Sequence, residues 1–407
     1  MLSVQDALQK LLADFQPLSV ETIPLVECLG RVLAEPVTAA NDLPHFDNSS
    51  MDGFALRSAD VTNLPRRLRV IGEIPAGTAP TLTVNEGEAA RIMTGAMLPP
   101  GADLIVPIED TDQNRATPDL PELVEIHKAG ASGAYIRRQG EDVRSGETLL
   151  AAGHQLRPQD LGLLAGLGIA NVNVIRLPRV AVLSTGDELL PPDIPLEPGK
   201  IRDMNSFTIP AMVAAVGAVP LYLGIAGDTA DAVRNLLHQA VDQGADLILS
   251  SAGVSVGAYD VVKDVLEELG AIGFWKVNMR PGKPLAYGQV RGVPFLGLPG
   301  NPVSALASFE VFARPAILKM MGLPPQIPEI EVIVGEDMPS DGRESYIRVT
   351  LSREDGKLIA RSTGTQSSGA ISSLVRADAL LVIPSGVTSV RAGDTLRIRP
   401  FAGQPIW

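Results

Sequence analysis

The sequence is poor in cysteine, histidine and positive charge, and each shortage excludes a class of protein. Cys28 is the only cysteine, so an intrachain disulfide is impossible, and four scattered histidines offer no metal-ligand spacing. The chain has 34 Lys and Arg residues against 47 Asp and Glu residues, a net charge of −13. Such a charge argues against a general nucleic-acid or anionic-membrane binder, which needs a basic footprint. Basic residues that do cluster are therefore informative.

Long apolar runs and targeting signals are also missing. The longest uncharged run, residues 206–227, is interrupted by Pro210, Gly217, Pro220 and Gly224. This pattern predicts a helix followed by a strand and not a membrane span. The first residues have acidic neighbours and no small-residue cleavage site, so they are not expected to be a secretory signal. Together these features predict a cytoplasmic protein.

The order of apolar segments predicts a multi-domain α/β protein. At about 150 residues per domain, 407 residues correspond to two to four domains. Strands alternate with helices in the centre of the chain, which predicts a doubly wound, mostly parallel sheet. A β-rich inserted domain precedes it and a small β-barrel follows. The proposed boundaries are 1–45 with 141–177 (a linking and dimerisation domain), 46–140 (the inserted domain), 178–325 (the central domain) and 326–407 (the barrel).

Individual elements follow from local patterns. Residues 3–15 have helical apolar spacing with Ser3 as a capping residue. Asp355-Gly356 is a hairpin signal in the barrel. In the central domain the predicted strands are 179–184, 219–224, 245–250, 274–277 and 294–298, and the predicted helices are 205–216, 229–243, 260–269 and 302–321.

Three central strands end in loops of small and polar residues. Because the carboxyl ends of parallel strands meet at one edge of a sheet, these loops are expected to share one pocket. In the first loop, Thr185 and Gly186 offer free backbone N–H groups that can cradle an anion. Glu188 would repel a phosphate unless a divalent cation such as Mg²⁺ bridges them. A simple turn or helix cap is the alternative role for this loop.

The second loop, SAGVSVGAYD, is built from residues that let the backbone approach a ligand closely, among them Ser251, Gly253 and Ser255. It ends at Asp260, which begins the next predicted helix and would also serve as an ordinary N-cap. Asp228 opens another helix after a strand. A single carboxylate at a strand end is readily explained as a helix cap. Carboxylates at three strand ends are harder to explain in this way.

A cationic segment and a proline-rich turn complete the pattern. Lys276, Arg280 and Lys283 lie within eight residues and are the best candidates for binding an anionic substrate, with chance surface charge as the alternative. In the third loop, Pro299 to Pro302, two prolines fix the backbone around Gly300 and Asn301. Asn301 is expected to cap a helix N-terminus that attracts anions.

Several common catalytic motifs are missing. The sequence has no Walker A lysine motif, no GxGxxG, and no convincing Ser-His-Asp or Cys-His pattern. In the N-terminal half, residues 135–142 place two arginines beside two carboxylates, which alone would suggest a surface ion-pair patch. The residues therefore predict an α/β enzyme that handles a phosphorylated ligand with a divalent metal.

The motifs DNSSMDGFALR, MTGAMLPPGAD, RRQGEDV, STGDEL, SAGVSVGAYD, MRPGKP and LPGNPVS occur in this order. With this order and spacing, the chain resembles the MoeA family of molybdopterin molybdenumtransferases, which includes the E domain of gephyrin. The central domain is also similar to the stand-alone, MogA-like molybdopterin adenylyltransferases. The resemblance implies insertion of molybdate into adenylylated molybdopterin, with Mg²⁺-dependent hydrolysis of the adenylate and release of AMP. It implies a homodimer in which the N-terminal motifs of one subunit approach the central domain of its partner.

The resemblance also assigns roles to residues. It implies catalytic carboxylates at Asp52, Asp142, Glu188, Asp228 and Asp260, with Glu188 and Asp228 associated with the metal. It implies substrate contacts at Thr94, Arg137, Thr185, Gly186, Ser251, Gly253, Ser255, Lys276, Arg280, Lys283, Pro299, Gly300, Asn301, Pro302 and Ser368. The loop around Ser368 departs from the family pattern, which has Gly before the serine.

No second adenylyltransferase-like domain is fused to the chain, so a separate molybdopterin adenylyltransferase is expected to supply the substrate. Two alternatives compete with the transferase interpretation. An adenylyltransferase would need only the central domain, and a scaffold would not require the polar loops.

Overall fold

The computed structural model describes residues 1–114, 119–251, 265, 268 and 273–403. The chain divides into two units. One contains Met1–Thr22, Gly30–Ala34 and Asn173–Trp407, and the other contains Ile23–Leu29 and Glu35–Val172. The boundaries between the units fall within β1 (Val20–Pro24) and β11 (Asn171–Ile175) and on both sides of Gly30–Ala34. Among the described residues, no helix is long and apolar enough to cross a membrane.

The central domain is built on a six-stranded sheet in the order β15-β12-β16-β20-β19-β17. The strands are β12 (Arg179–Thr185), β15 (Val219–Ala226), β16 (Leu247–Ser251), β17 (Gly273–Lys276), β19 (Pro284–Val290) and β20 (Val293–Leu298). The first four in the sheet order are parallel, and β19 and β17 pair antiparallel. The doubly wound, mostly parallel domain is therefore confirmed, although the sequence analysis did not identify β19.

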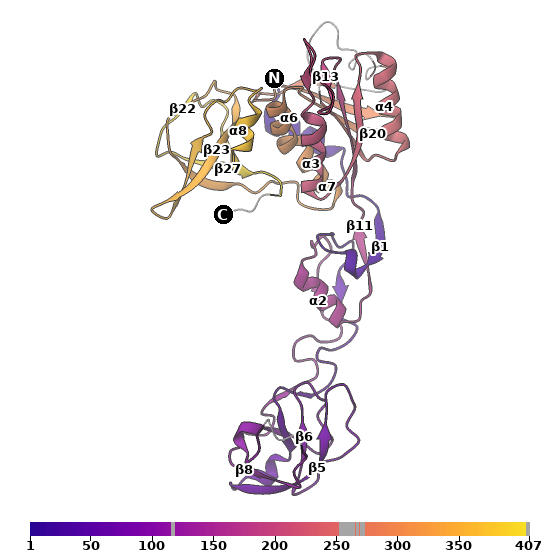
Figure 1. Cartoon of the computed structure of the whole chain (residues 1–407), viewed down its shortest axis with the longest axis vertical. Helices are drawn as coiled ribbons and strands as arrows, with labels where there is room; N and C mark the ends of the chain where they lie inside the picture. Colours follow the sequence, from indigo (N-terminus) through magenta and orange to yellow (C-terminus); the bar gives the residue numbers. More distant parts are fainter. Residues whose placement is uncertain (115–118, 252–264, 266–267, 269–272, 404–407) are drawn as a thin grey trace. The chain divides into compact units, whose positions relative to one another are not determined.

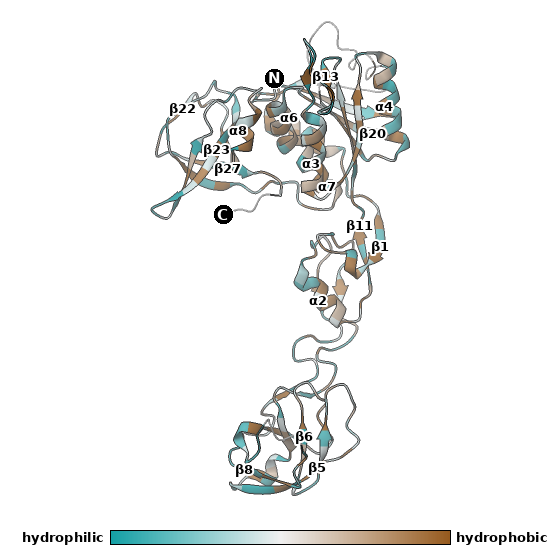
Figure 2. Cartoon of the chain, in the orientation of Figure 1, coloured by the Kyte–Doolittle hydropathy of each residue, from teal (hydrophilic) through white to brown (hydrophobic). Residues whose placement is uncertain are grey.

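Both faces of this sheet are covered by helices. Along β12, Val180 and Val182 contribute to one core while Ala181 and Leu183 contribute to the other, because successive side chains of a strand point to opposite faces. α3 (Asn205–Val216), α6 (Pro302–Ser308) and α7 (Arg314–Met320) lie on one side, and α4 (Ala230–Asp242) lies on the other (Figure 1). The strands are mostly hydrophobic, whereas α4 has hydrophobic and hydrophilic sides (Figure 2).

The predicted helix at 302–321 is present with one irregularity. Between α6 and α7 the backbone forms a π-helical segment, Phe309–Ala313. Pro315 lies two residues after this segment, and its missing N–H cannot continue the regular ladder there. The predicted helix at 260–269 lies outside the described residues, apart from positions 265 and 268.

The N-terminal helix belongs to the core of the central domain. α1 (Val4–Ala13) buries Val4, Ala7 and Leu11 in the core that also holds α3 and α7. Ser3 caps it by accepting a hydrogen bond from the N–H of Asp6, as the sequence predicts. Residues 1–45 were predicted to form a domain with 141–177, but the apolar stripe of this helix is covered by the central domain.

The C-terminal domain is a closed five-stranded barrel, as expected. Its strands are β21 (Ile330–Val334), β23 (Glu344–Glu354), β24 (Lys357–Ser362), β25 (Ala379–Ile383) and β27 (Thr395–Pro400). β23 pairs with both β24 and β25, which closes the sheet. The hairpin between β23 and β24 turns at Asp355 and Gly356, both with positive φ, as the sequence predicts. Smaller elements of this domain are α8 (Ile371–Val375), β22 (Met338–Pro339) and β26 (Ser389–Val390).

The barrel is joined to the central domain through its longest strand. β18 (Met279–Arg280) pairs in parallel with the start of β23, so the MRPGKP segment is part of the barrel sheet. Within β23, Ile347 and Val349 fill the barrel, while Tyr346 packs in the core of the central domain. The strand is therefore buried on both faces in this part.

The second unit contains the β-rich inserted domain. Its sheet has the order β7-β4-β6-β5-β8. These strands are β4 (Gly53–Leu56), β5 (Arg66–Ile74), β6 (Glu88–Ile92), β7 (Leu104–Pro107) and β8 (Leu123–Ile126). Other elements are β2 (Val37–Thr38), β3 (Asn48–Ser49), β9 (Ile136–Arg137), β10 (Thr148–Leu150) and α2 (Pro158–Gly166).

Candidate functional site

A cavity of about 430 Å³ lies at the carboxyl edge of the central sheet. The ends of β12, β16 and β20 border it, as expected for an open α/β sheet. Its walls combine apolar side chains with polar and charged ones, and the polar and charged residues make up half of the lining. The lining residues are Thr185, Glu188, Leu189, Ile201, Arg202, Asp203, Met204, Asn205, Ser251, Gly282, Pro284, Pro299, Gly300, Asn301, Pro302 and Ser304.

The structure brings seven of the predicted site residues into this cavity. They are Thr185, Glu188, Ser251, Pro299, Gly300, Asn301 and Pro302. The predicted contacts Gly253 and Ser255 and the predicted carboxylate Asp260 lie outside the described residues. Asn301 occupies the N-cap position of α6, but its side chain makes no capping hydrogen bond, contrary to the sequence prediction.

In the loop after β12, Gly186 lies close to the carboxylate of Glu188. Gly186 has φ of +145°, and a Cβ atom there would lie 2.6 Å from a carboxylate oxygen of Glu188. A larger residue at this position would therefore displace Glu188. Because Glu188 lines the cavity and is exposed, its charge is available to a ligand or cation.

The next strand-end loop is joined to the first by a reciprocal pair of hydrogen bonds. The N–H of Asp187 donates to Oδ2 of Asp228 at 3.2 Å, and the N–H of Asp228 donates to Oδ1 of Asp187 at 3.0 Å. Thr229, and not Asp228, caps α4 by accepting from the N–H of Ala232. Asp228 is thus an exposed carboxylate held next to the Glu188 loop, although it is not among the residues that line the cavity.

Of the predicted lysines, Lys276 ends β17 and Lys283 directly precedes β19, its antiparallel partner, beside the cavity. Lys276 at the end of β17 is paired with Pro284, and the N–H of Val277 donates to the carbonyl of Lys283 at 2.9 Å. Gly282 and Pro284 both line the cavity, so Lys283 lies at its rim. Both lysines are exposed, and within the described part of the chain neither forms an ion pair.

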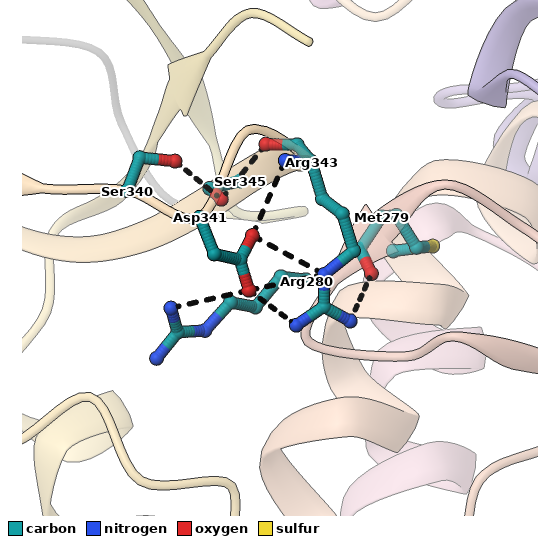
Figure 3. Close-up of polar contacts among 6 residues, drawn as sticks. All are labelled: Met279, Arg280, Ser340, Asp341, Arg343 and Ser345. Atoms are coloured by element: carbon teal, nitrogen blue, oxygen red, sulfur yellow. Dashed lines mark hydrogen bonds and ion pairs between the residues drawn. The ribbon is translucent and has the colours of Figure 1, made fainter. Parts of the chain in front are cut away.

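Arg280 is held by a carboxylate from the barrel (Figure 3). Asp341 accepts from Arg280 at 3.4 Å and also from the guanidinium of Arg343, which in turn donates to the carbonyl of Met279 at 3.3 Å. The hydrogen bonds from Arg343 hold the pKa of Asp341 below its usual value. Asp341 therefore connects the cationic segment to the barrel.

Arg348 is a candidate site residue that the sequence analysis missed. It lies on β23 with only 1% of its surface exposed. Its guanidinium donates to Ser373 Oγ at 2.9 Å and to the carbonyls of Thr365 and Ser367 at 3.1 Å each. Burial, and then the nearby charge of Arg280, lower its pKa to about 10. All these protein partners are neutral, so its positive charge is not cancelled by a hydrogen-bonded carboxylate among the described residues.

The loop at 364–369 is organised around Arg348. The side chain of Gln366 accepts from the N–H of Arg348, and two loop carbonyls accept from its guanidinium. The predicted contact Ser368 is half-buried in this loop. An alternating strand pattern assigns Arg348 to the face opposite Ile347 and Val349, and only the structure shows that this face is also buried.

The predicted residues of the N-terminal half lie in the second unit. Oδ1 of Asp52 accepts from the N–H and the hydroxyl of Thr94 at 2.8 and 2.7 Å, so these two residues are together. Arg137 in β9 is paired with Asn48, and it is exposed, as is Asp142.

The charged side chains next to Arg137 interact with other residues of the second unit. Arg138 forms an ion pair with Asp47 at 2.6 Å. The N–H of Gln139 and then Arg138 lower the pKa of Asp47.

The fold and cavity define a class of protein: a multi-domain α/β protein with a pocket at the carboxyl edge of its central sheet, with the carboxylates of Glu188 and Asp203 in its wall and Lys283 at its rim. Comparison with known sequences agrees. Residues 2–168 match the MoeA N-terminal region (domain I and II), residues 181–319 a probable molybdopterin binding domain, and residues 331–401 the MoeA C-terminal region (domain IV). The chain belongs to the MoeA family.

Relatives match almost the whole chain. The Molybdopterin molybdenumtransferase 2 of Mycobacterium tuberculosis is 42% identical over 390 residues, covering 93% of this chain and 94% of the relative. The Molybdopterin molybdenumtransferase of Haemophilus influenzae is 37% identical over 98% of this chain and 99% of the relative. A crystal structure of a molybdopterin biosynthesis moeA protein from Pyrococcus horikoshii is similar with a TM-score of 0.84 and 31% identity, covering 99% of this chain and 100% of that one.

Proposed function

We propose that this protein is a molybdopterin molybdenumtransferase of molybdenum cofactor biosynthesis. It inserts molybdate into adenylylated molybdopterin while water hydrolyses the adenylate and AMP leaves. It acts as a homodimer, downstream of a separate molybdopterin adenylyltransferase. The named relatives, at up to 42% identity over most of the chain, support this assignment.

The observation that carries the proposal is the distribution of groups around one cavity. Pro299, Pro302 and Pro284 supply rigid apolar wall that suits a flat ring. Glu188 is in the wall, and Lys283 is at the rim. A substrate that joins a heterocycle to a phosphate fits a cavity that combines this proline surface with charged groups.

The cations have distinct tasks in this proposal. Lys276 and Lys283 attract the phosphate or molybdate oxygens as exposed point charges. Arg280, held by Asp341, offers a fixed guanidinium to an oxyanion. Arg348 adds a buried positive charge whose electrostatic effect is less screened by water.

The carboxylates fit a Mg²⁺ ion. Mg²⁺ is usually held by one or two protein carboxylates together with substrate phosphate and water, so a larger protein cluster is not needed. Glu188 and Asp228, on neighbouring and hydrogen-bonded loops, would hold it. When bound, the ion would neutralise phosphate charge and bring the phosphate close to these carboxylates.

The experiment measures AMP release from adenylylated molybdopterin by the purified protein, with and without molybdate and Mg²⁺. We expect release to require both additions and to fall at least about a hundredfold in Glu188→Ala or Asp228→Ala, the scale of losing a group that stabilises the transition state. Asp193→Ala, at an exposed site in the same domain, is the matched control and should be unaffected.

Two other outcomes would contradict the transferase proposal. ATP-dependent adenylylation of free molybdopterin would instead identify an adenylyltransferase. A folded protein that releases no AMP under any of these conditions would contradict the enzymatic proposal and favour a scaffold.

A further inference from the structure

The segment that carries the site cations contacts α6 at Gly282, which lies between Arg280 and Lys283. Gly282 is buried and has φ of +105°, a conformation that favours glycine. A Cβ atom added to Gly282 would lie 2.5 Å from the hydroxyl oxygen of Ser308 and 3.5 Å from the carbonyl oxygen of Ser304. Two successive turns of α6 therefore leave room at this point only for a residue without a side chain.

The hydroxyl of Ser308 makes no hydrogen bond among the described residues, although the side chain is fully buried. A serine within a helix commonly donates to the carbonyl one turn earlier, which here belongs to Ser304. Alanine at position 308 would bury no unpaired polar atom, so stability does not explain the hydroxyl. Outside the residues that adjoin Gly282, the oxygen of Ser308 is the heavy atom nearest to the place where a side chain on Gly282 would begin.

Backbone hydrogen bonds anchor the cationic segment on both sides of Gly282. Before it, Met279 belongs to β18, which pairs with β23, and the carbonyl of Met279 also accepts from Arg343 at 3.3 Å (Figure 3). After it, the carbonyl of Lys283 accepts from the N–H of Val277 at 2.9 Å. Only three residues separate these anchors. Any displacement of Gly282 must therefore change the positions of the two cations on either side of it.

We propose that Ser308 is a positioning residue: its buried hydroxyl packs against Gly282 and so fixes the place of Arg280 and Lys283 at the cavity. The inference rests on the proposed function, in which these cations meet phosphate or molybdate oxygens. Ser308 is not among the residues that line the cavity, so it acts through Gly282, which is. Placement matters because a displacement of about 1 Å can reduce activity by about a hundredfold.

The test measures molybdate binding to the full-length protein by calorimetry, in a cycle of two substitutions. Ser308→Ala should weaken binding about threefold because Gly282 loses its support. Its stability to denaturant should be unchanged or higher, since an unpaired hydroxyl is removed. Gly282→Ala should weaken binding at least about tenfold, because its Cβ atom meets the hydroxyl of Ser308. In the double variant that hydroxyl is gone, so binding should be at least about threefold tighter than in Gly282→Ala alone.

The expected sign of the Ser308→Ala effect thus differs between the two backgrounds. It weakens binding in the wild type and strengthens binding in Gly282→Ala, a reversal that requires direct contact between the two positions. Gly393→Ala is the matched control for the glycine, because Gly393 has φ of +95° but nothing within 4 Å of an added Cβ atom. In that background Ser308→Ala should weaken binding by the same factor as in the wild type.

The remaining outcomes overturn the inference. Unchanged molybdate binding in Ser308→Ala, or the same effect in both backgrounds, would show that the hydroxyl has no positioning role. Absence of molybdate binding by the wild type would also contradict it, whereas AMP release by the same preparation decides the transferase assignment separately.

A second variant covers the case in which Gly282→Ala does not fold. Ser308→Val places a larger side chain against Gly282 from the helix side. It should displace the segment and weaken molybdate binding more than Ser308→Ala does. Equal binding by the two variants would contradict the inference.

Discussion

The carboxylates of the second unit and those of the central cavity have the same chemistry but opposite surroundings. In the second unit, both oxygens of Asp103 accept hydrogen bonds, from the N–H and hydroxyl of Ser58 and the hydroxyl of Ser132, at 2.7 to 2.8 Å. In the cavity, Asp203 has one oxygen without a partner among the described residues. A paired carboxylate stabilises the fold, whereas an unpaired buried one lowers stability and is retained where function needs it.

Arg348 extends this comparison to a cation. Its charge is buried, but its protein partners are hydroxyl and carbonyl groups. The hydrogen bonds organise the loop at 364–369, while none of these partners carries a negative charge. Arg348 therefore resembles Asp103 because its side chain makes hydrogen bonds to the protein. It resembles Asp203 because part of its interaction is unmatched, since no hydrogen-bonded carboxylate neutralises its charge.

The largest effect is expected for Arg348→Met. The change leaves two loop carbonyls and one hydroxyl without their donor, at about 1 to 3 kcal/mol for each buried group left unpaired. Removing a buried charge offsets part of this cost. We expect a net loss of about 2 to 4 kcal/mol in local stability, seen as faster amide hydrogen exchange in the loop at 364–369.

Arg361→Met is the matched control for this prediction. Arg361 lies in the same barrel, and its ion pair with Glu354 is solvent-exposed. Exposed pairs contribute little to stability. Loop exchange should therefore stay at the wild-type rate, and an equal acceleration in both variants would contradict the role assigned to Arg348.

A smaller effect is expected when Asp is replaced by Asn at two positions. In Asp103→Asn the serine hydroxyls can turn to accept from the NH₂ group, but hydrogen bonds to a charged carboxylate are replaced by weaker neutral ones, so the second unit should lose about 1 to 2 kcal/mol of stability. In Asp203→Asn the oxygen that accepts from Ser206 can be retained and the NH₂ group takes the unpaired place, so stability should change by less than about 0.5 kcal/mol. Denaturant unfolding with a separate probe in each unit makes the measurement, because a multi-domain chain need not unfold in two states.

The two variants together test whether one oxygen of Asp203 is unpaired in the folded protein. If the two variants lost equal stability, the oxygen of Asp203 would have a partner in solution, and the comparison between the two regions would fail.

The fold was predictable from the sequence wherever one face or both faces of an element are uniformly apolar. The run at 179–184 and the alternation in the barrel strands predict their own burial. β19 was missed because Pro284, Gly288 and Gln289 interrupt its pattern. The place of α1 was also missed, because an apolar stripe shows that a helix is covered but not which domain covers it.

The site was predictable only where its residues end a strand in a small or proline-rich loop. Thr185, Glu188 and Pro299 are examples, since the topology of a parallel sheet brings such loops together. Asp203 and Asn205 follow a two-residue strand and look like ordinary helix-start residues. Whether an oxygen has a partner is a property of the packed structure, and no local pattern carries it.

The smallest effect is expected at Asp341, which is paired and exposed. Asp341→Asn removes the carboxylate that holds Arg280, so KM for adenylylated molybdopterin should rise by at most about fivefold, the range of an exposed ion pair, with kcat nearly unchanged. Asp337→Asn is the control, since that carboxylate accepts from the N–H of Ala392 elsewhere in the barrel.

The ionisation of Asp341 predicts how this effect varies with pH. Arg343 holds the pKa of Asp341 below its ordinary value, so the group is ionised in the fold throughout the range above about pH 4. A lowered pKa means that the pair's contribution is complete above the unfolded value and is lost only as pH falls through the folded one. The KM ratio between Asp341→Asn and the wild type should therefore be constant from pH 6 to pH 8, about two units above that limit. A ratio that changes within this range would show that Arg280 is positioned by some other group.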